Sequence, residues 1–274
     1  MAGDGGLAAL RLSDGAFLRY LEVPGDDPPV IWLHGWQCSS TGELMPAAVQ
    51  PSLARRRSLL VDLLGHGYSD KPHDFAYTLV EHARTVVELI DALGLHDCAL
   101  VGHSMGGEIA IRVAAARPQI VSTLVMVEGT VDPHGEDVFD GQGEDEFVRS
   151  GFADLIASQR ATAEGDPTST AAVHLGITEL LEPRAVFRAD VSMRDGHDPS
   201  ARLLLTKLSM QRWYLRGEFS EPEPDFDAFL ADIGVSLVQV PHTGHAMGLQ
   251  NPRGLVDAVA AILAGDARPS GAPG

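Results

Sequence analysis

The chain has few cysteines, and this shortage argues against a domain stabilised by disulfides. Its 274 residues include two, Cys38 and Cys98, which could form at most one bridge and do not have the spacing of metal ligands. Cys98 lies within an apolar run. We therefore interpret both as reduced thiols of a cytosolic protein.

Positive charge and long hydrophobic runs are also scarce. The chain has 20 lysines and arginines against 38 aspartates and glutamates, a formal net charge of −18 that repels phosphate backbones and anionic lipids. No run approaches the ~18 apolar residues of a membrane-spanning helix, and Asp4 stands where a signal peptide would carry positive charge. We predict a cytoplasmic protein that acts on a small molecule and binds neither nucleic acid nor membrane, and the sequence leaves open whether it forms a homodimer.

Short apolar segments typical of strands alternate with helical patterns along most of the chain. Hydrophobic residues make up 45% of it, enough to bury a sizeable core. Several strand segments carry polar residues only at their ends, as strands covered on both faces do. Between them, residues 78–94 place apolar side chains on one helical stripe that ends at Gly94. This alternation predicts an α/β fold in which helices flank a mostly parallel sheet.

The alternation stops in the middle of the chain, where helical patterns continue without a convincing strand. We predict a helical cap at 131–209 inserted into a core of 1–130 and 210–265, with a disordered tail at 266–274. The front of the cap, "HGEDVFDGQGEDE", is strongly acidic, but its oxygens lack a regular ligand spacing. We interpret it as a solvated loop and assign no metal.

One serine lies between glycines in the stretch "LVGHSMGGEIA". Ser104 is the centre of the pattern G-x-S-x-G, directly after a strand pattern and directly before a helix pattern, which is the context that this motif requires. Such a turn exposes the hydroxyl at the edge of the sheet, where the helix N-terminus faces developing negative charge. We therefore predict that Ser104 is a nucleophile; a helix cap would need only a hydroxyl at this position.

A serine that attacks an acyl carbon needs two donors for the resulting oxyanion. One is the backbone N–H of Met105, the residue after the nucleophile. We assign the other to Trp36, because the strand pattern in "VIWLHGWQC" ends at His34 and Gly35 and its loop reaches the same edge. The alternative for this segment is an ordinary turn at the end of a strand.

The serine also needs a base, and a histidine beyond the last strand pattern can reach it. The segment "VQVPHTGHAMGLQNP" contains two, of which we prefer His245, in the loop after Gly244. We interpret His242, beside a proline at the strand end, as structural. Most of the nine other histidines are expected at the surface or in loops, with packing or loop roles for His66 and His103.

These motifs resemble those of the α/β-hydrolase superfamily, from about residue 16 to 263 through "HGW", "DLLGHGYSDKP", "GHSMGG" and "TGHAMGLQNP". The resemblance implies an eight-stranded, mostly parallel sheet with an inserted helical cap, and a triad in the chain order serine, acid, histidine. Epoxide hydrolases and haloalkane dehalogenases of this superfamily use an aspartate nucleophile, and Ser104 argues against both. Where the family usually has a proline after "HG", this chain has Gln37.

The acid departs from the family pattern. An aspartate usually follows the seventh strand as G-x-x-D, but the corresponding segment here, 217–220, reads "GEFS". Some members carry the carboxylate at the end of the sixth strand, where Glu128 ends the apolar run "LVMVEGT". A charge at that position needs a partner, and the imidazole of His245 would be one. We prefer Glu128, with Glu218, Glu221 and Asp132 as alternatives.

These residues predict a serine hydrolase that cleaves a carboxylic ester, lactone or thioester of a small, largely apolar substrate through an acyl-enzyme. No organic cofactor is expected. Two alternatives stay open: a non-hydrolytic enzyme of the same fold, for acyl transfer, a lyase reaction or cyclisation, and a ligand-binding receptor that retains the pocket. The missing G-x-x-D aspartate favours the receptor, and Glu128 as a replacement acid argues against it.

Overall fold

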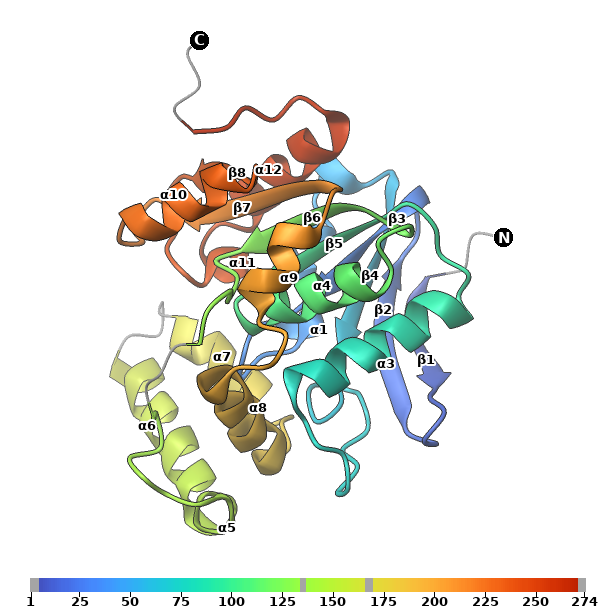
Figure 1. The fold of residues 1–274 in the computed structure, drawn as a ribbon. Helices are drawn as coiled ribbons and strands as arrows, with labels where there is room; N and C mark the ends of the chain where they lie inside the picture. Colours follow the sequence, from blue (N-terminus) through green and yellow to red (C-terminus); the bar gives the residue numbers. More distant parts are fainter. Residues whose placement is uncertain (1–4, 134–136, 166–169, 271–274) are drawn as a thin grey trace.

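Eight strands form one sheet in a computed structural model that describes residues 5–133, 137–165 and 170–270 (Figure 1). Their spatial order is β1-β2-β4-β3-β5-β6-β7-β8. β2 pairs antiparallel with β1 and β4, and all later pairs are parallel. The predicted α/β-hydrolase fold is confirmed. The strands are β1 (Gly6–Arg11), β2 (Phe17–Val23), β3 (Asp26–Leu33), β4 (Arg56–Asp62), β5 (Cys98–His103), β6 (Val121–Val127), β7 (Gln211–Gly217) and β8 (Ser236–Val240).

β1 has no counterpart among the strand segments recognised in the sequence, although the family resemblance implies eight strands. It lies at the edge of the sheet and pairs with β2 alone, from Gly6 opposite Glu22 to Arg11 opposite Phe17. None of its side chains is buried, and Leu7 is exposed. An edge strand of this kind does not need the apolar pattern that marks a covered strand.

Helices cover both faces of the sheet because alternate residues of each central strand point to opposite sides. Ile31 and Leu33 of β3 belong to the core cluster that α3, α4, α9 and α10 cover, whereas Val30 and Trp32 face α2, α11 and α12. Thr78 caps α3 by accepting the N–H of Glu81. The helices are α1 (Ser40–Glu43), α2 (Met45–Ala48), α3 (Leu79–Ala92), α4 (Met105–Ala116), α9 (Ala201–Lys207), α10 (Pro224–Asp232), α11 (Met247–Gln250) and α12 (Pro252–Ala264), with a short 3₁₀ turn at Pro51–Leu53.

A second group of helices, which we call the cap helices, separates β6 from β7 and gathers beside the sheet (Figure 1). The aromatic and aliphatic side chains of this group form an apolar cluster of their own, which Trp36 joins from the loop after β3. α9 falls within the predicted cap but packs against α4 of the core. The cap helices are α5 (Glu144–Glu146), a π-helical turn (Phe147–Gly151), α6 (Phe152–Gly165), α7 (Thr170–Thr178) and α8 (Pro183–Asp195).

Most described residues of the acidic segment, 137–146, are exposed, as the interpretation as a solvated loop predicts, and two of its carboxylates pair with arginines of α8. Asp137 accepts two backbone N–H groups of its own turn and lies 2.9 Å from Nη1 of Arg194. Glu144 pairs with Arg188 at 2.7 Å. Residues 134–136 of this segment lie outside the described part. Within the described ranges, no group of three or more histidine, cysteine or carboxylate side chains could hold a metal ion.

The C-terminal segment follows the edge of the sheet as far as it is described. The Ser270 N–H donates to Leu237 O at 2.8 Å, and its hydroxyl accepts the Gln239 N–H at 3.0 Å. The predicted disorder of 266–274 therefore does not apply at Ser270, and residues 271–274 lie outside the described part. Among the helices of the described residues, none combines the length and apolar character needed to cross a membrane.

Among the described residues, four histidines are buried: His34, His66, His82 and His103. The first two lie in loops, and the burial of His66 and His103 agrees with the packing or loop roles expected for them. The rings of His34, His66 and His82 follow one another at centroid distances of 4.9 and 5.9 Å. His34 Nε2 accepts the Leu63 N–H, which requires that nitrogen to be unprotonated. Burial lowers the pKa of all three rings, that of His82 to about 3.

These lowered pKa values make folding stability depend on pH. Each ring is neutral in the folded chain but binds a proton after unfolding once the pH falls below ~6.5, so stability decreases from there towards the folded-state pKa. We expect the free energy of unfolding to be lower at pH 5 than at pH 7, and the variant His82→Phe to lose about 2 kcal/mol less over that interval. Urea unfolding at both pH values measures the difference; equal losses would contradict the assignment of a neutral His82.

Candidate active site

Ser104 forms the turn between β5 and α4. Its backbone has φ 49° and ψ −119°, a conformation that costs energy for a residue with a Cβ atom and persists only where neighbours enforce it. Its N–H donates to Val127 O at 3.0 Å, and its carbonyl accepts the N–H groups of Gly107 and Thr130 at 2.8 and 2.9 Å. The strained strand-to-helix turn that the serine motif predicts is therefore present and is held by the end of β6.

The glycines of the motif allow backbones to approach closely. A Cβ atom on Gly102 would lie 2.2 Å from Gly106 O, and one on Gly106 would lie 2.4 Å from Leu33 O. A Cβ atom on Gly107 would lie 2.5 Å from Gly129 Cα. Side chains at these positions would push the end of β3 and the loop after β6 away from the serine.

The loop after β6 brings Glu128 towards His245. One carboxylate oxygen, Oε2, lies 3.8 Å from His245 Nδ1, an ion-pair separation that is longer than a direct hydrogen bond. The other, Oε1, accepts the Gly217 N–H at 2.7 Å. Burial by itself raises the pKa of the Glu128 carboxyl, but the His245 imidazole, the Gly217 N–H and the Ser220 hydroxyl hold it below its usual range. Glu128 is therefore ionised at neutral pH, with its charge beside the imidazole.

The alternative acids and the alternative base lie apart from this pair. Glu218 accepts the backbone N–H of His242 at 2.8 Å, and its Oε2 lies 3.5 Å from His242 Nδ1. The His242 side chain is 82% exposed. Glu221 and Asp132 are exposed as well. The structure thus brings Glu128, and none of the alternatives, next to His245, while the catalytic roles of both remain predictions.

The loop after β3, where the sequence places one oxyanion donor, is bound to the cap helices. The Trp36 indole Nε1 donates to Val186 O of α8 at 2.8 Å. Gln37 has φ 56°, and its side-chain oxygen accepts from Gln159 Nε2 of α6 at 3.0 Å. Both contacts connect the loop to the cap helices. The backbone N–H groups of Trp36 and Met105 are still predictions as oxyanion donors.

A buried Glu43–His103 pair lies beneath this site, and neither residue was assigned to it from the sequence. His103 precedes the nucleophile, and its Nδ1 contacts Oε1 of Glu43, the last residue of α1. Both side chains are buried. Burial by itself raises the pKa of the Glu43 carboxyl, but His103, with the Gly35 N–H, lowers it to about 2. A lone acid in the short segment "STGE" carries no pattern that marks it as part of a site.

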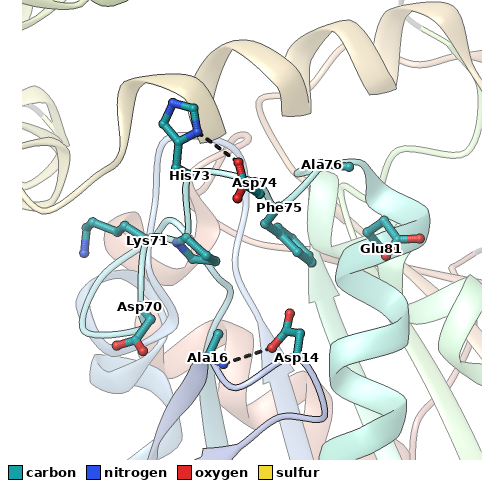
Figure 2. A pocket seen from close by; sticks show the side chains of 10 residues that line it. Asp14, Ala16, Asp70, Lys71, His73, Asp74, Phe75, Ala76 and Glu81 are labelled. Carbon is teal, nitrogen blue, oxygen red and sulfur yellow. Dashed lines mark hydrogen bonds and ion pairs between the residues drawn. The ribbon is translucent and has the colours of Figure 1, made fainter.

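Of two hollows on the described part of the protein, one is lined by a predicted site residue and the other is not. One, of about 420 Å³, lies between the loop after β3 and the cap helices and is lined by residues that include Trp36, Gln37, Phe139, Phe147 and Leu155. The other, of about 630 Å³, is shown in Figure 2 and contains none of the predicted site residues. Its Asp70 is already paired with Arg19 at 2.5 Å. Of the predicted site residues, the first hollow is lined by Trp36 alone.

The sequence profile of the α/β hydrolase fold family matches residues 28–171, more than half of the chain. The chain belongs to this family.

Individual proteins that resemble this chain share part of its sequence or only its fold. The sn-1-specific diacylglycerol lipase ABHD11 of Mus musculus is 37% identical over 113 residues, which are 40% of this chain and 36% of the lipase. The dihydrolipoyllysine-residue acetyltransferase component of the acetoin cleaving system of Pseudomonas putida is 31% identical over 196 residues, 67% of this chain and 51% of that protein. The chain thus spans about a third to a half of these curated relatives. An esterase from Thermogutta terrifontis superposes with a TM-score of 0.79 at 20% identity over 96% of this chain and 99% of the esterase, a likeness that shows the fold.

Proposed function

We propose that the chain is a serine hydrolase that cleaves a carboxylic ester, lactone or thioester of a small, largely apolar substrate through an acyl-enzyme. The observation that carries the proposal is the strained turn at Ser104: its backbone is hydrogen-bonded to the loop of Glu128, and the residue before it, His103, contacts His245. Strain of this kind persists at sites where it exposes a reacting group.

The geometry supports a mechanism in two stages. Ser104 attacks the acyl carbon as His245 takes its proton, and ionised Glu128 orients the imidazole and stabilises its protonated form. The N–H groups of Trp36 and Met105 bind the oxyanion. The leaving group then receives the proton from His245, and a water molecule, deprotonated by the same histidine, releases the acid from the acyl-enzyme.

The surroundings of the site support the proposed substrate class. The 420 Å³ hollow beside the loop after β3 has several aromatic and aliphatic lining residues and is large enough for a small apolar group. The net charge of −18 disfavours polyanionic substrates. The lipase of Mus musculus, by its name, acts on an ester, which is the same bond type.

Covalent labelling tests the nucleophile. We expect a fluorophosphonate to add once to the wild-type protein and not to Ser104→Ala, because an activated serine beside an oxyanion site attacks such phosphorus electrophiles. Ser150→Ala, which removes an exposed hydroxyl of the cap helices, is the matched control and should label as the wild type does. Intact-protein mass spectrometry counts the adducts. Equal labelling of Ser104→Ala, or none of the wild type where a reference esterase reacts, would reject the proposal.

Acyl transfer is a second candidate that two observations favour. The relative from Pseudomonas putida is named as an acetyltransferase component, and the His245 side chain is 59% exposed, so that an acceptor other than water can reach it. The serine, base and oxyanion donors would keep their roles, and the acyl group would pass to the acceptor. Release of free acid from an aryl ester without added acceptor favours hydrolysis, whereas turnover that requires an added alcohol or thiol favours transfer.

A further inference from the structure

Glu43 distributes its two carboxylate oxygens between two loops of the site. Oε1 contacts Nδ1 of His103. Oε2 accepts the N–H of Gly35, the residue before Trp36, at 3.1 Å. The carboxylate has no accessible surface. A buried charge needs such partners, because it has lost its hydration.

The second nitrogen of His103 reaches the base loop. Nε2 lies 2.8 Å from the backbone carbonyl oxygen of His245, and the two ring centroids are 4.8 Å apart. A carbonyl oxygen only accepts hydrogen bonds, so Nε2 carries a proton, while Nδ1 faces the carboxylate of Glu43. With a second proton on Nδ1, His103 is an imidazolium whose Nε2 donates to the His245 carbonyl and whose Nδ1 forms an ion-pair contact with Glu43. Burial by itself would lower its pKa, but Glu43 raises it above its usual range.

The pair also packs directly against the serine turn. A Cβ atom on Gly35 would lie 2.8 Å from His103 Nδ1 and 3.2 Å from Ser104 Cβ, so the absence of a side chain there lets the ring lie under the loop. One buried ion pair thus contacts the loop after β3, the nucleophile turn and the loop of the base.

We propose that Glu43 and His103 are positioning residues that fix His245 relative to Ser104. This inference rests on the proposed function. The His245 side chain is 59% exposed, so packing alone does little to hold it. His103 instead donates a hydrogen bond to the backbone carbonyl of His245, and its ring is itself held by the ion pair with Glu43 of α1.

Several charged or titratable groups surround the His103 ring, and the test must separate their effects. Glu43 faces it from α1, His34 from the end of β3, Glu128 from the loop after β6 and His174 from α7, besides His245 itself. Glu43→Gln keeps the size of the side chain and an oxygen for the Gly35 N–H but removes the charge. His103→Phe keeps a ring and removes the donor to His245. In His103→Phe alone, the buried Glu43 carboxylate has lost its charged partner, which can prevent folding. The double variant lacks both this charge and the donor to His245, so it tests the loss of the donor without an unpaired buried charge.

Acylation kinetics test the inference. We expect both single variants to lower the maximal rate of acylation by an aryl ester about 10- to 100-fold at unchanged KM, because a small misplacement of the base has that effect and the substrate contacts are retained. The double variant should be no slower than His103→Phe, since Glu43 acts through His103. His66→Phe, which removes a buried histidine away from His245, is the control and should acylate at the wild-type rate. Variants that fold and acylate like the wild type, while Ser104→Ala does not react, would overturn the inference and leave the proposed function intact.

A spectroscopic measurement keeps the inference testable if the wild type shows no activity. In ¹⁵N-histidine NMR spectra at pH 7, His103 should show two protonated ring nitrogens in the wild type, and the double variant should shift or broaden the His245 ring signals. Unchanged His245 signals in the double variant would overturn the positioning role. Failure of the wild type to react with the fluorophosphonate would reject the proposed function alone.

Discussion

His245→Ala is expected to slow acylation of Ser104 by about 10⁶-fold, the loss typical of removing the base of a serine hydrolase. Without the imidazole, the serine proton has no acceptor when the hydroxyl attacks, and the oxyanion donors alone supply the residual rate. Pre-steady-state release of the leaving group from a chromogenic aryl ester measures this step separately from deacylation.

His242→Ala is the matched control for this prediction. The His242 side chain is 82% exposed and interacts with Glu218 instead of Glu128. We expect its acylation rate to stay within about threefold of the wild-type rate, as for surface substitutions outside a site. A large loss in His242→Ala together with a small one in His245→Ala would reassign the base to His242.

Glu128→Gln is expected to slow turnover by up to about 10⁴-fold while the protein remains folded. The carboxylate fixes the tautomer of His245 and stabilises the imidazolium that forms as Ser104 loses its proton. Glutamine preserves the size of the side chain and an acceptor for the Gly217 N–H, so the loss reports the missing charge. Steady-state kcat with the same aryl ester measures it, and a thermal melt verifies the fold.

Two glutamates of the loop after β7 control for this prediction. Glu218→Gln and Glu221→Gln remove charges from the segment where the family usually carries its aspartate, but neither side chain lies beside His245. We expect each to cost about tenfold or less. If Glu221→Gln or Glu218→Gln abolished turnover and Glu128→Gln did not, the acid would belong to that loop.

Strand order explains why Glu128 can replace the usual aspartate. β6 lies between β5, which leads to Ser104, and β7, which ends at Gly217. A residue directly after β6 is therefore close both to the serine turn and to the loop where the usual acid stands. Gly107 and Gly129 allow the contact between the two loops, since a Cβ on Gly107 would lie 2.5 Å from Gly129 Cα. The apolar run that ends in Glu128 predicted this position, and the order of the strands supplied its neighbours.

The sequence by itself determined the features that depend on local periodicity and on fixed spacing. Alternating strand and helix patterns predicted an α/β fold, and the motifs added the resemblance to the α/β hydrolases. G-x-S-x-G predicted the turn at Ser104, because only residues without a Cβ atom allow the close backbone contacts that this turn makes. The edge strand β1 carries no such pattern, because it buries no side chain.

The tertiary structure alone decided which distant groups meet. The sequence favours His245 and Glu128 but does not show their contact; the tertiary structure brings the two together, pairs Asp137 with α8, and joins Glu43 to His103. Such contacts depend on strand order and on the paths of loops far apart in the chain, and a single buried acid or histidine leaves no periodic signal. Its environment, and with it its pKa and its partner, exists only once the chain has folded.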